Sequence, residues 1–241
     1  MRDALTRLKW KAVHASVWLH RLLGAEYTLH HPYLYSTASP WFSQDFQKIF
    51  ERVKHRTVVT QDRCYMLRQF ARQCLHVAGD YAECGVYKGG TAHLLADTVR
   101  GSDKKLLLFD TFGGMPESAE SDASGHRQGD FGDTSLESVT QYLAGFEGVQ
   151  FYPGFIPATF EPFKDRRFAF VHVDVDLYSS VADCCEFFYD RLSPGGILVF
   201  DDYGFKMYRE AARRAVEEFF TEKPNPPIVL PTGQAVVIKA T

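Results

Sequence analysis

The sequence lacks several features that would place it in a specialised class. Among its 241 residues, no stretch reaches the roughly 18 uninterrupted apolar residues of a membrane span. The five cysteines are odd in number and show no CxxC spacing, which argues against a zinc ribbon and against a disulfide framework. They are Cys64, Cys74, Cys84, Cys184 and Cys185. This pattern favours reduced, buried thiols and a cytoplasmic location.

An excess of one charge is also missing. Lys and Arg number 27 against 30 Asp and Glu, so the net charge is −3, and we expect no nucleic-acid partner. The N-terminal stretch has no clean apolar core, because His14, His20 and Arg21 interrupt it, and this argues against a signal peptide. No repeat or low-complexity tract divides the chain. A hydrophobic content of 45% suits one large soluble domain.

The first 56 residues differ in character from the rest. They are rich in aromatic residues and mixed in charge, and we expect helices and a loop that cap a main domain formed by residues 57–241. Apolar residues recur near helical spacing at Leu5, Leu8, Val13, Val17 and Leu22. Two interpretations remain for this helix, namely packing that includes homo-oligomer formation, and association with a membrane surface.

From Asp80 onward, short strand-like and helix-like segments alternate. Strands are predicted at 80–84, 104–110, 149–154, 167–176 and 195–203, and helices at 61–78, 90–100, 134–146, 179–192 and 206–220. Residues 226–239 resemble a terminal hairpin. The alternation predicts an α/β fold with a doubly wound, mostly parallel sheet and a C-terminal antiparallel hairpin. Ligands bind such sheets at the carboxyl ends of the strands.

The first strand end carries an acid and a glycine-rich turn. In "AECGVYKGGTA", Glu83 is followed by Gly85, Gly89 and Gly90 at the start of a helix, where backbone can approach a ligand closely. The spacing is not G-x-G-x-x-G, which disfavours a nicotinamide cofactor. The alternative is a turn that needs glycine for structural reasons alone.

The second strand end carries Asp110, in "LLLFDTFGGMP". An acid at this place can accept hydrogen bonds from ribose hydroxyls, and the alternative is a helix-capping aspartate. The polar stretch that follows, residues 117–135, is long for a loop, and we expect either a mobile lid or an ordinary surface loop. Within it, His126 and Arg127 either reach a substrate or face solvent.

Two carboxylate clusters follow the next two strands. Asp174 ends one strand, and Asp201 and Asp202 end the other, so the parallel sheet should bring all three together. Three carboxylates suit a hard cation such as Mg²⁺, which would acidify a bound hydroxyl. Asp176 is predicted to cap the next helix. The alternative for the whole set is a row of helix caps.

These motifs resemble one known family. "AECGVYKGG", "LFDTFGGMP", "DTSLESV", "YPGFIPATF", "HVDVDLYSS", "LSPGGILVFDDYG" and "REAARRAVEEF" have the order and spacing of the macrocin-type (TylF-like) sugar O-methyltransferases. Those enzymes have the class I, Rossmann-like methyltransferase fold and use S-adenosylmethionine and magnesium. The resemblance covers about residues 55–240. It leaves residues 1–50 and the loop 117–133 unmatched.

The resemblance implies roles for particular residues. The methionine part of S-adenosylmethionine would lie against Glu83, Cys84, Gly85, Val86 and Tyr87, with Thr57 and Val58 over its carboxylate end. Asp110 would hold the ribose, and the adenosine would be framed by Thr111, Phe112, Gly113, Gly114, Ser135 and Gly154. Asp174, Asp201 and Asp202 would be the metal ligands, with Asp174 as general base.

The resemblance also implies an acceptor class, a hydroxyl of a sugar or glycosylated natural product, or of a polysaccharide. Because the unmatched segments are where acceptor choice would be made, the particular sugar does not carry over. Three alternatives remain open. They are methylation of a non-sugar hydroxyl, a glycosyltransferase that uses the D-x-D motif at Asp174 and Asp176, and a scaffold that has lost its chemistry.

Overall fold

The structure is a computed structural model that describes residues 41, 43–117 and 124–240. The chain divides into two compact units, Met1–Phe42 and Ser43–Thr241. The helix predicted around residues 5–22, and with it the suggested oligomer or membrane-surface role, lies outside the described residues. The second unit begins before the predicted boundary at residue 57, so it includes the short helix α2 (Gln44–Val53).

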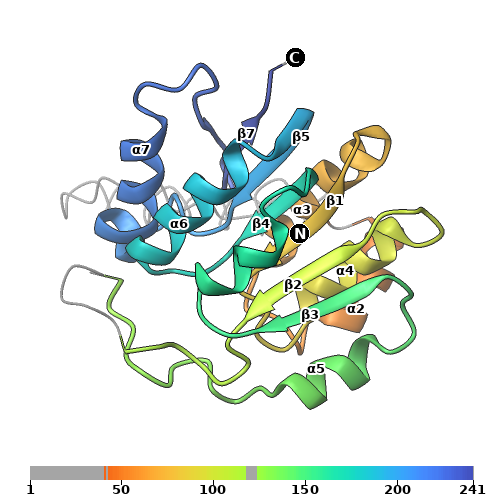
Figure 1. Cartoon of the computed structure of the whole chain (residues 1–241). Helices are drawn as coiled ribbons and strands as arrows, with labels where there is room; N and C mark the ends of the chain where they lie inside the picture. Colours follow the sequence, from red (N-terminus) through yellow and green to blue (C-terminus); the bar gives the residue numbers. More distant parts are fainter. Residues whose placement is uncertain (1–40, 42, 118–123, 241) are drawn as a thin grey trace, which may run out of the picture. The chain divides into compact units, whose positions relative to one another are not determined.

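A seven-stranded sheet forms the centre of the second unit (Figure 1). Its strands are β1 (Asp80–Cys84), β2 (Leu106–Asp110), β3 (Val149–Pro153), β4 (Phe168–Val173), β5 (Leu192–Phe200), β6 (Ile228–Val229) and β7 (Ala235–Ile238). They lie in the order β3-β2-β1-β4-β5-β7-β6. The first five pair in parallel, whereas β7 is antiparallel to both β5 and β6. The predicted doubly wound sheet with a terminal hairpin is therefore confirmed.

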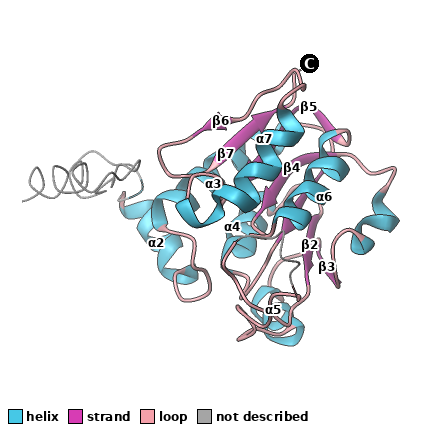
Figure 2. Ribbon diagram, turned by 90° about the vertical axis from the view of Figure 1, so that its left-hand side faces the viewer, coloured by secondary structure: helices cyan, strands magenta, loops and turns pink. Residues whose placement is uncertain are grey.

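Helices cover both faces of the sheet (Figures 1 and 2). The α-helices of the sheet unit are α2, α3 (Gln61–Gln73), α4 (Gly90–Val99), α5 (Leu136–Leu143), α6 (Tyr178–Tyr189) and α7 (Arg214–Phe220). Short 3₁₀ turns are η3 (Cys74–His76), η4 (Ala158–Phe163) and η5 (Lys206–Tyr208), and η6 (Arg209–Arg213) is a π-helical segment. Buried side chains of α6 and α7 join one core cluster, and those of α3, α4 and α5 join another.

The helix predicted over 206–220 is divided into three pieces, η5, η6 and α7. Ala211 departs from helical geometry, with φ −117° and ψ −106°, and this breaks the run. The break lies just after Tyr208, a residue that lines the cavity described below. None of the helices in the described part of the chain has the length and apolar character needed to span a bilayer.

The inner parallel strands β1, β2 and β4 are largely buried and correspondingly apolar, whereas the edge strand β3 is only partly buried. All six residues of β4, "FAFVHV", are buried, and His172 is its one polar member. Glu83 in β1 is likewise fully buried. Because charged groups are costly to desolvate, these two exceptions indicate a site nearby. The five cysteines are free and buried, as the sequence predicted.

Candidate functional site

The strand order reverses between β1 and β4, which have β2 and β5 on their outer sides. Such a reversal opens a crevice at the carboxyl ends of the strands. A cavity of about 510 Å³ lies there. The predicted site residues that line it are Thr57, Val58, Gly85, Val86, Tyr87, Asp110, Thr111, Gly114, Gly154, Asp174, Asp201 and Asp202. Most of the predicted donor and metal residues therefore share one cavity.

The glycine turn after β1 forms one wall of this cavity. Gly85 has φ +85°, and a Cβ atom there would lie 1.8 Å from the backbone oxygen of Asp174. At Gly90 a Cβ atom would lie 2.7 Å from the backbone oxygen of Arg56. Both glycines are required because the backbone packs closely at these positions. The turn therefore needs glycine for structural reasons, as one of the two interpretations of the sequence held. The same packing places the backbone of Gly85, Val86 and Tyr87 against the cavity.

Asp110 holds this turn in place. Its Oδ2 accepts hydrogen bonds from the backbone N–H groups of Val86 (2.6 Å) and Tyr87 (2.9 Å), and its Oδ1 accepts one from Phe112 (2.6 Å). No helix begins at Asp110, which rules out the helix-cap alternative. A carboxylate has about four acceptor positions. The fourth position is taken by a long contact, Thr111 Oγ1 at 3.5 Å from Oδ1, so a hydroxyl in the cavity would compete with Thr111 for Asp110.

Five predicted donor residues lie outside the cavity lining. Glu83 is buried below the turn, and the thiol of Cys84 lies in the core. Phe112 is packed in the second core cluster with φ +52°, and Gly113 is not among the lining residues. The side chain of Ser135 caps α5 by accepting a hydrogen bond of 3.1 Å from the N–H of Ser138.

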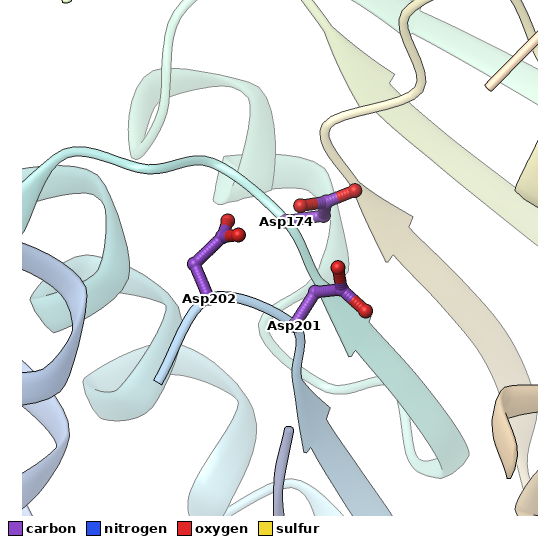
Figure 3. A group of neighbouring side chains, drawn as sticks. All are labelled: Asp174, Asp201 and Asp202. Atoms are coloured by element: carbon purple, nitrogen blue, oxygen red, sulfur yellow. The ribbon is translucent and has the colours of Figure 1, made fainter. Parts of the chain in front are cut away.

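The three predicted metal ligands meet at the ends of β4 and β5 (Figure 3). Val173 and Phe200 are paired in register, so Asp174 and Asp201 follow them side by side. Each of the three carboxyl groups offers an oxygen, and these atoms all lie within 4.8 Å of one another. The expectation that the parallel sheet brings these acids together is met.

The helix-cap alternative does not explain these acids. The N-cap of α6 is Leu177, with no side-chain hydrogen bond, and the N-cap of η5 is Phe205. The prediction that Asp176 caps α6 is wrong. Asp176 has a left-handed backbone, φ +59°, and its carboxylate lines the cavity and interacts with the hydroxyl of Tyr208. The turn from β4 into α6 directs it toward the site instead of toward the helix.

The acids of this cluster differ in their electrostatics. Burial tends to raise the pKa of Asp201, but the nearby imidazole of His172 and the charge of Arg63 outweigh it and hold this pKa below its usual value. Burial and the neighbouring charge of Asp201 raise the pKa of Asp174 to about 7. Burial and the charge of Asp174 raise the pKa of Asp202 well above its usual value. Protein groups thus compensate the charge of Asp201 more fully than the charges of Asp174 and Asp202.

Three partners of Asp201 were missed by the sequence analysis. The guanidinium of Arg63, from the first turn of α3, donates to Asp201 Oδ2 and lies 3.9 Å from Asp202 Oδ1. Gln234 Nε2 donates to Asp201 Oδ1 at 2.8 Å. His172 Nε2 lies 3.7 Å from the same oxygen. Only His172 could have been recognised from the sequence, because it is a polar residue inside an otherwise apolar strand.

His172 also links the two acid-bearing strand ends. Its Nδ1 lies 2.8 Å from Glu83 Oε1, and both side chains are fully buried. Burial alone would lower the pKa of His172, but the nearby carboxylates of Asp201 and Glu83 raise it to about 10. The raised pKa favours the protonated form of His172, whose ring lies between the donor turn and the metal-binding acids.

The acid cluster fits a hard cation. The carboxyl groups that line the cavity include those of Asp174, Asp176, Asp201 and Asp202, and the adjacent buried basic side chains are Arg63 and His172. Asp202 Oδ2 is buried and has no hydrogen-bond partner in the protein. An unpartnered buried carboxylate oxygen is costly, and a divalent cation ligated by oxygen would compensate it.

A doubly wound sheet with an antiparallel β7 and an acid-lined cavity at its switch point defines the class I methyltransferase architecture. The solved structure of the O-methyltransferase NovP has this fold, with a TM-score of 0.64 and 24% sequence identity over 77% of this chain and 84% of that one. The macrocin-O-methyltransferase (TylF) family model matches residues 47–228. The chain therefore belongs to the macrocin-O-methyltransferase family.

Two curated relatives are O-methyltransferases. One, from Streptomyces olivaceus, is named 8-demethyl-8-(2,3-dimethoxy-alpha-L-rhamnosyl)-tetracenomycin-C 4'-O-methyltransferase and is 32% identical over 148 residues. The other, demethyldecarbamoylnovobiocin O-methyltransferase from Streptomyces niveus, is 29% identical over 167 residues. The matches cover 56% and 61% of this chain. They span 57% and 63% of the relatives' own lengths.

Proposed function

We propose that the chain transfers a methyl group from S-adenosylmethionine to a hydroxyl of a sugar-bearing acceptor, with Mg²⁺ as the metal. The observation that carries the proposal is the common cavity, because Asp110 and the glycine turn line it together with Asp174, Asp201 and Asp202. Donor and acceptor must lie side by side for an in-line transfer. A glycosyltransferase reading of the D-x-D motif has no comparable use for Asp110 and the turn.

The proposed donor site follows from the cavity wall. The backbone of Gly85, Val86 and Tyr87 would contact the methionine part, and Asp110 would accept from the ribose hydroxyls. Donor contacts are likewise proposed for the other lining residues, which are Thr57, Val58, Thr111, Gly114 and Gly154. Supporting roles behind the wall are proposed for Glu83, Cys84, Phe112, Gly113 and Ser135. The acids of the cavity also favour the positive sulfonium of the donor.

The proposed acceptor chemistry depends on the acid cluster. Asp174, Asp201 and Asp202 would hold Mg²⁺, which when bound lowers the pKa of an acceptor hydroxyl and orients it. The sequence analysis assigned the general base to Asp174. A carboxylate that ligates a cation is a weaker base, and Asp176 lies in the same cavity outside the triad. Burial raises the pKa of Asp176, which suits proton acceptance, so we assign the base to Asp176.

The rim of the cavity indicates the kind of acceptor. Val58, Phe155 and Met207 line it from three separate segments and are 60%, 61% and 50% exposed. Among the described lining residues, Arg63 is the one Lys or Arg, and it is bound to Asp201. Apart from the proposed Mg²⁺, a nucleotide diphosphate would find acids here and no available Lys or Arg side chain among the described lining residues. The rim therefore supports a sugar attached to an apolar group, as in the name of the rhamnosyl-tetracenomycin relative.

A label-transfer assay tests the proposal. Purified protein, labelled S-adenosylmethionine and Mg²⁺ are incubated with free sugars, nucleotide-linked sugars, lipid-linked sugars and glycosides of apolar aglycones. We expect label in the glycosides and little in the nucleotide-linked sugars. Transfer to a nucleotide-linked sugar alone would contradict the acceptor assignment. Binding of a nucleotide sugar without any binding of S-adenosylmethionine would contradict the methyltransferase assignment.

The donor site yields a binding prediction. S-adenosylhomocysteine at about one hundred times its Kd should raise Tm by about 5–10 °C, because it binds the folded state alone. Asp110→Ala should remove most of this shift, since it deletes the proposed ribose acceptor and frees the amides of Val86 and Tyr87. Glu137→Ala, on the exposed side of α5, is the matched control and should keep the full shift. An unchanged shift in Asp110→Ala would show that the ribose assignment is wrong.

Two further parts of the proposal concern the cellular compartment and the self-association of the chain. The free, buried cysteines support a reducing compartment, and we propose the cytoplasm. Self-association through residues 5–22 is also proposed, and the solution mass of the full chain compared with a chain lacking residues 1–40 would test it.

A further inference from the structure

The turn after β1 contains a residue in an unusual backbone conformation. Tyr87 is left-handed, with φ +50°, a region that bulky residues seldom adopt. Such a conformation is unfavourable by itself and persists only where neighbouring groups hold it. Because Tyr87 lines the cavity beside Gly85 and Val86, the groups that hold its backbone also shape the proposed donor site.

Side chains hold both polar groups of the Tyr87 backbone. Asp110 Oδ2 accepts a hydrogen bond of 2.9 Å from its N–H group. On the other side of the residue, the hydroxyl of Thr134 donates to its carbonyl oxygen at 2.6 Å. Thr134 is not among the residues that line the cavity, so its hydroxyl supports the turn from outside.

The position of Thr134 is fixed by the helix that follows it. Thr134 directly precedes Ser135, the residue that caps α5. This helix packs closely on the turn, because a Cβ atom at Gly89 would lie 3.0 Å from a side-chain carbon of Val139, which is fully buried. The Thr134 hydroxyl is therefore attached to a packed helix, which makes it a firm support for the turn.

A second contact from the same segment is more exposed. Asp133 Oδ1 accepts a hydrogen bond of 2.7 Å from the Tyr87 hydroxyl, and its Oδ2 pairs with the ammonium group of Lys88. The side chain of Asp133 is 66% exposed, and exposed ion pairs stabilise a protein little. The bond from Thr134 to the carbonyl is partly buried. It is therefore the contact that we expect to hold the turn.

We propose that Thr134 is a positioning residue for S-adenosylmethionine, and that it acts by holding the backbone of Tyr87. This inference rests on the proposed function, in which the turn contacts the methionine part of the donor. Without the hydroxyl, the carbonyl of Tyr87 loses its donor, and the turn must be ordered when the donor binds. The cost of that ordering lowers donor affinity and leaves the reaction of the bound complex unchanged.

The substitution Thr134→Val removes the hydroxyl and keeps the size of the side chain. We expect the Kd of S-adenosylhomocysteine and the KM of S-adenosylmethionine each to rise about 10-fold, as for a partly buried carbonyl left without its donor. The kcat at saturating donor should change by less than about twofold. Thr134→Ser keeps a hydroxyl and should restore most of the donor affinity. A purely structural role would lower Tm and leave Kd unchanged.

Calorimetry with S-adenosylhomocysteine tests the proposal, together with donor kinetics on the best acceptor from the label-transfer assay. Thr98→Val is the matched control, because Thr98 Oγ1 also donates to a backbone carbonyl, that of Leu94 at 2.8 Å, at the far end of α4. This control should keep the Kd of the parent. An unchanged Kd in Thr134→Val, or an equal loss in Thr134→Ser or Thr98→Val, would overturn the assignment. A parent protein that binds no S-adenosylhomocysteine would instead refute the proposed function.

Discussion

Replacement of Asp202 with asparagine should abolish methyl transfer and leave affinity for S-adenosylhomocysteine intact. Asp202 belongs to the three-acid group, and its buried Oδ2 has no protein partner that would explain it. The proposed donor contacts, Asp110 and the turn after β1, lie on other strands. Loss of a direct metal ligand should reduce the rate by at least about 100-fold, the upper range for residues that act behind a ligand.

Two measurements check this prediction. Label transfer is followed as Mg²⁺ is titrated, and donor affinity is measured by calorimetry with S-adenosylhomocysteine. EDTA should reproduce the effect in the parent protein, and added Mg²⁺ should reverse it. Full activity in EDTA after exhaustive dialysis would contradict the metal proposal, whatever the behaviour of the variant.

The same substitution should stabilise the metal-free protein at alkaline pH. The folded-state pKa values of Asp174 and Asp202 lie above the ordinary value of 3.8, with that of Asp174 at about 7. Between these values the folded state binds more protons than the unfolded state, so stability falls as pH rises from about 4 to about 7. Asp202→Asn removes one of the two charges. In EDTA, the decrease in Tm between pH 5 and pH 8 should therefore be smaller in the variant than in the parent.

The positions of these acids could be predicted because parallel strands are recognisable. Strands buried on both faces appear as apolar runs, and their carboxyl ends share one edge of the sheet. Residues 168–173 and 195–200 form two such runs, and Asp174, Asp201 and Asp202 directly follow them. Strand order and the meeting of the acids then follow from the fold class. The local turn was less predictable, since the left-handed conformation of Asp176 leaves no mark in the sequence.

The groups that compensate Asp201 could not be predicted in the same way. Arg63 belongs to a helix of alternating polar and apolar residues, and Gln234 belongs to a hairpin turn near the C-terminus. These two residues are 171 positions apart in the sequence, yet Gln234 Nε2 donates to the backbone oxygen of Arg63. Both side chains also donate hydrogen bonds to Asp201. Such pairing depends on how α3 and β7 pack onto the sheet. No local sequence pattern predicts this pairing.

These contacts distinguish Asp201 from Asp202, and we expect the two asparagine variants to differ in stability. Asp201 is fully buried and faces Arg63 and His172, so Asp201→Asn leaves two buried cations without their common anion. Breaking a buried ion pair on one side costs about 3–5 kcal/mol, which lowers Tm by about 10 °C in a chain of this size. Asp202→Asn should instead keep or raise Tm in metal-free buffer.

The stability of the Asp201→Asn and Asp202→Asn variants is best compared near pH 6. His172 gains its partners on folding, and its pKa rises from 6.5 to about 10. Its contribution to stability is therefore complete below pH about 6.5 and is lost as pH rises through about 10. Thermal melts in EDTA at pH 6 and pH 10 should show the largest deficit of Asp201→Asn at the lower pH.

A second substitution separates charge from packing at Asp201. Arg63→Met removes the guanidinium while keeping an unbranched apolar chain, so the double variant Asp201→Asn/Arg63→Met no longer holds that buried cation unpaired. It should recover part of the Tm lost in Asp201→Asn, because removal of both partners of a buried pair costs less than removal of one. Equal melting temperatures for Asp201→Asn and Asp202→Asn would refute the distinction. In that case all three acids would depend on an external cation to the same degree, and Arg63 and His172 would not preorganise Asp201 for it.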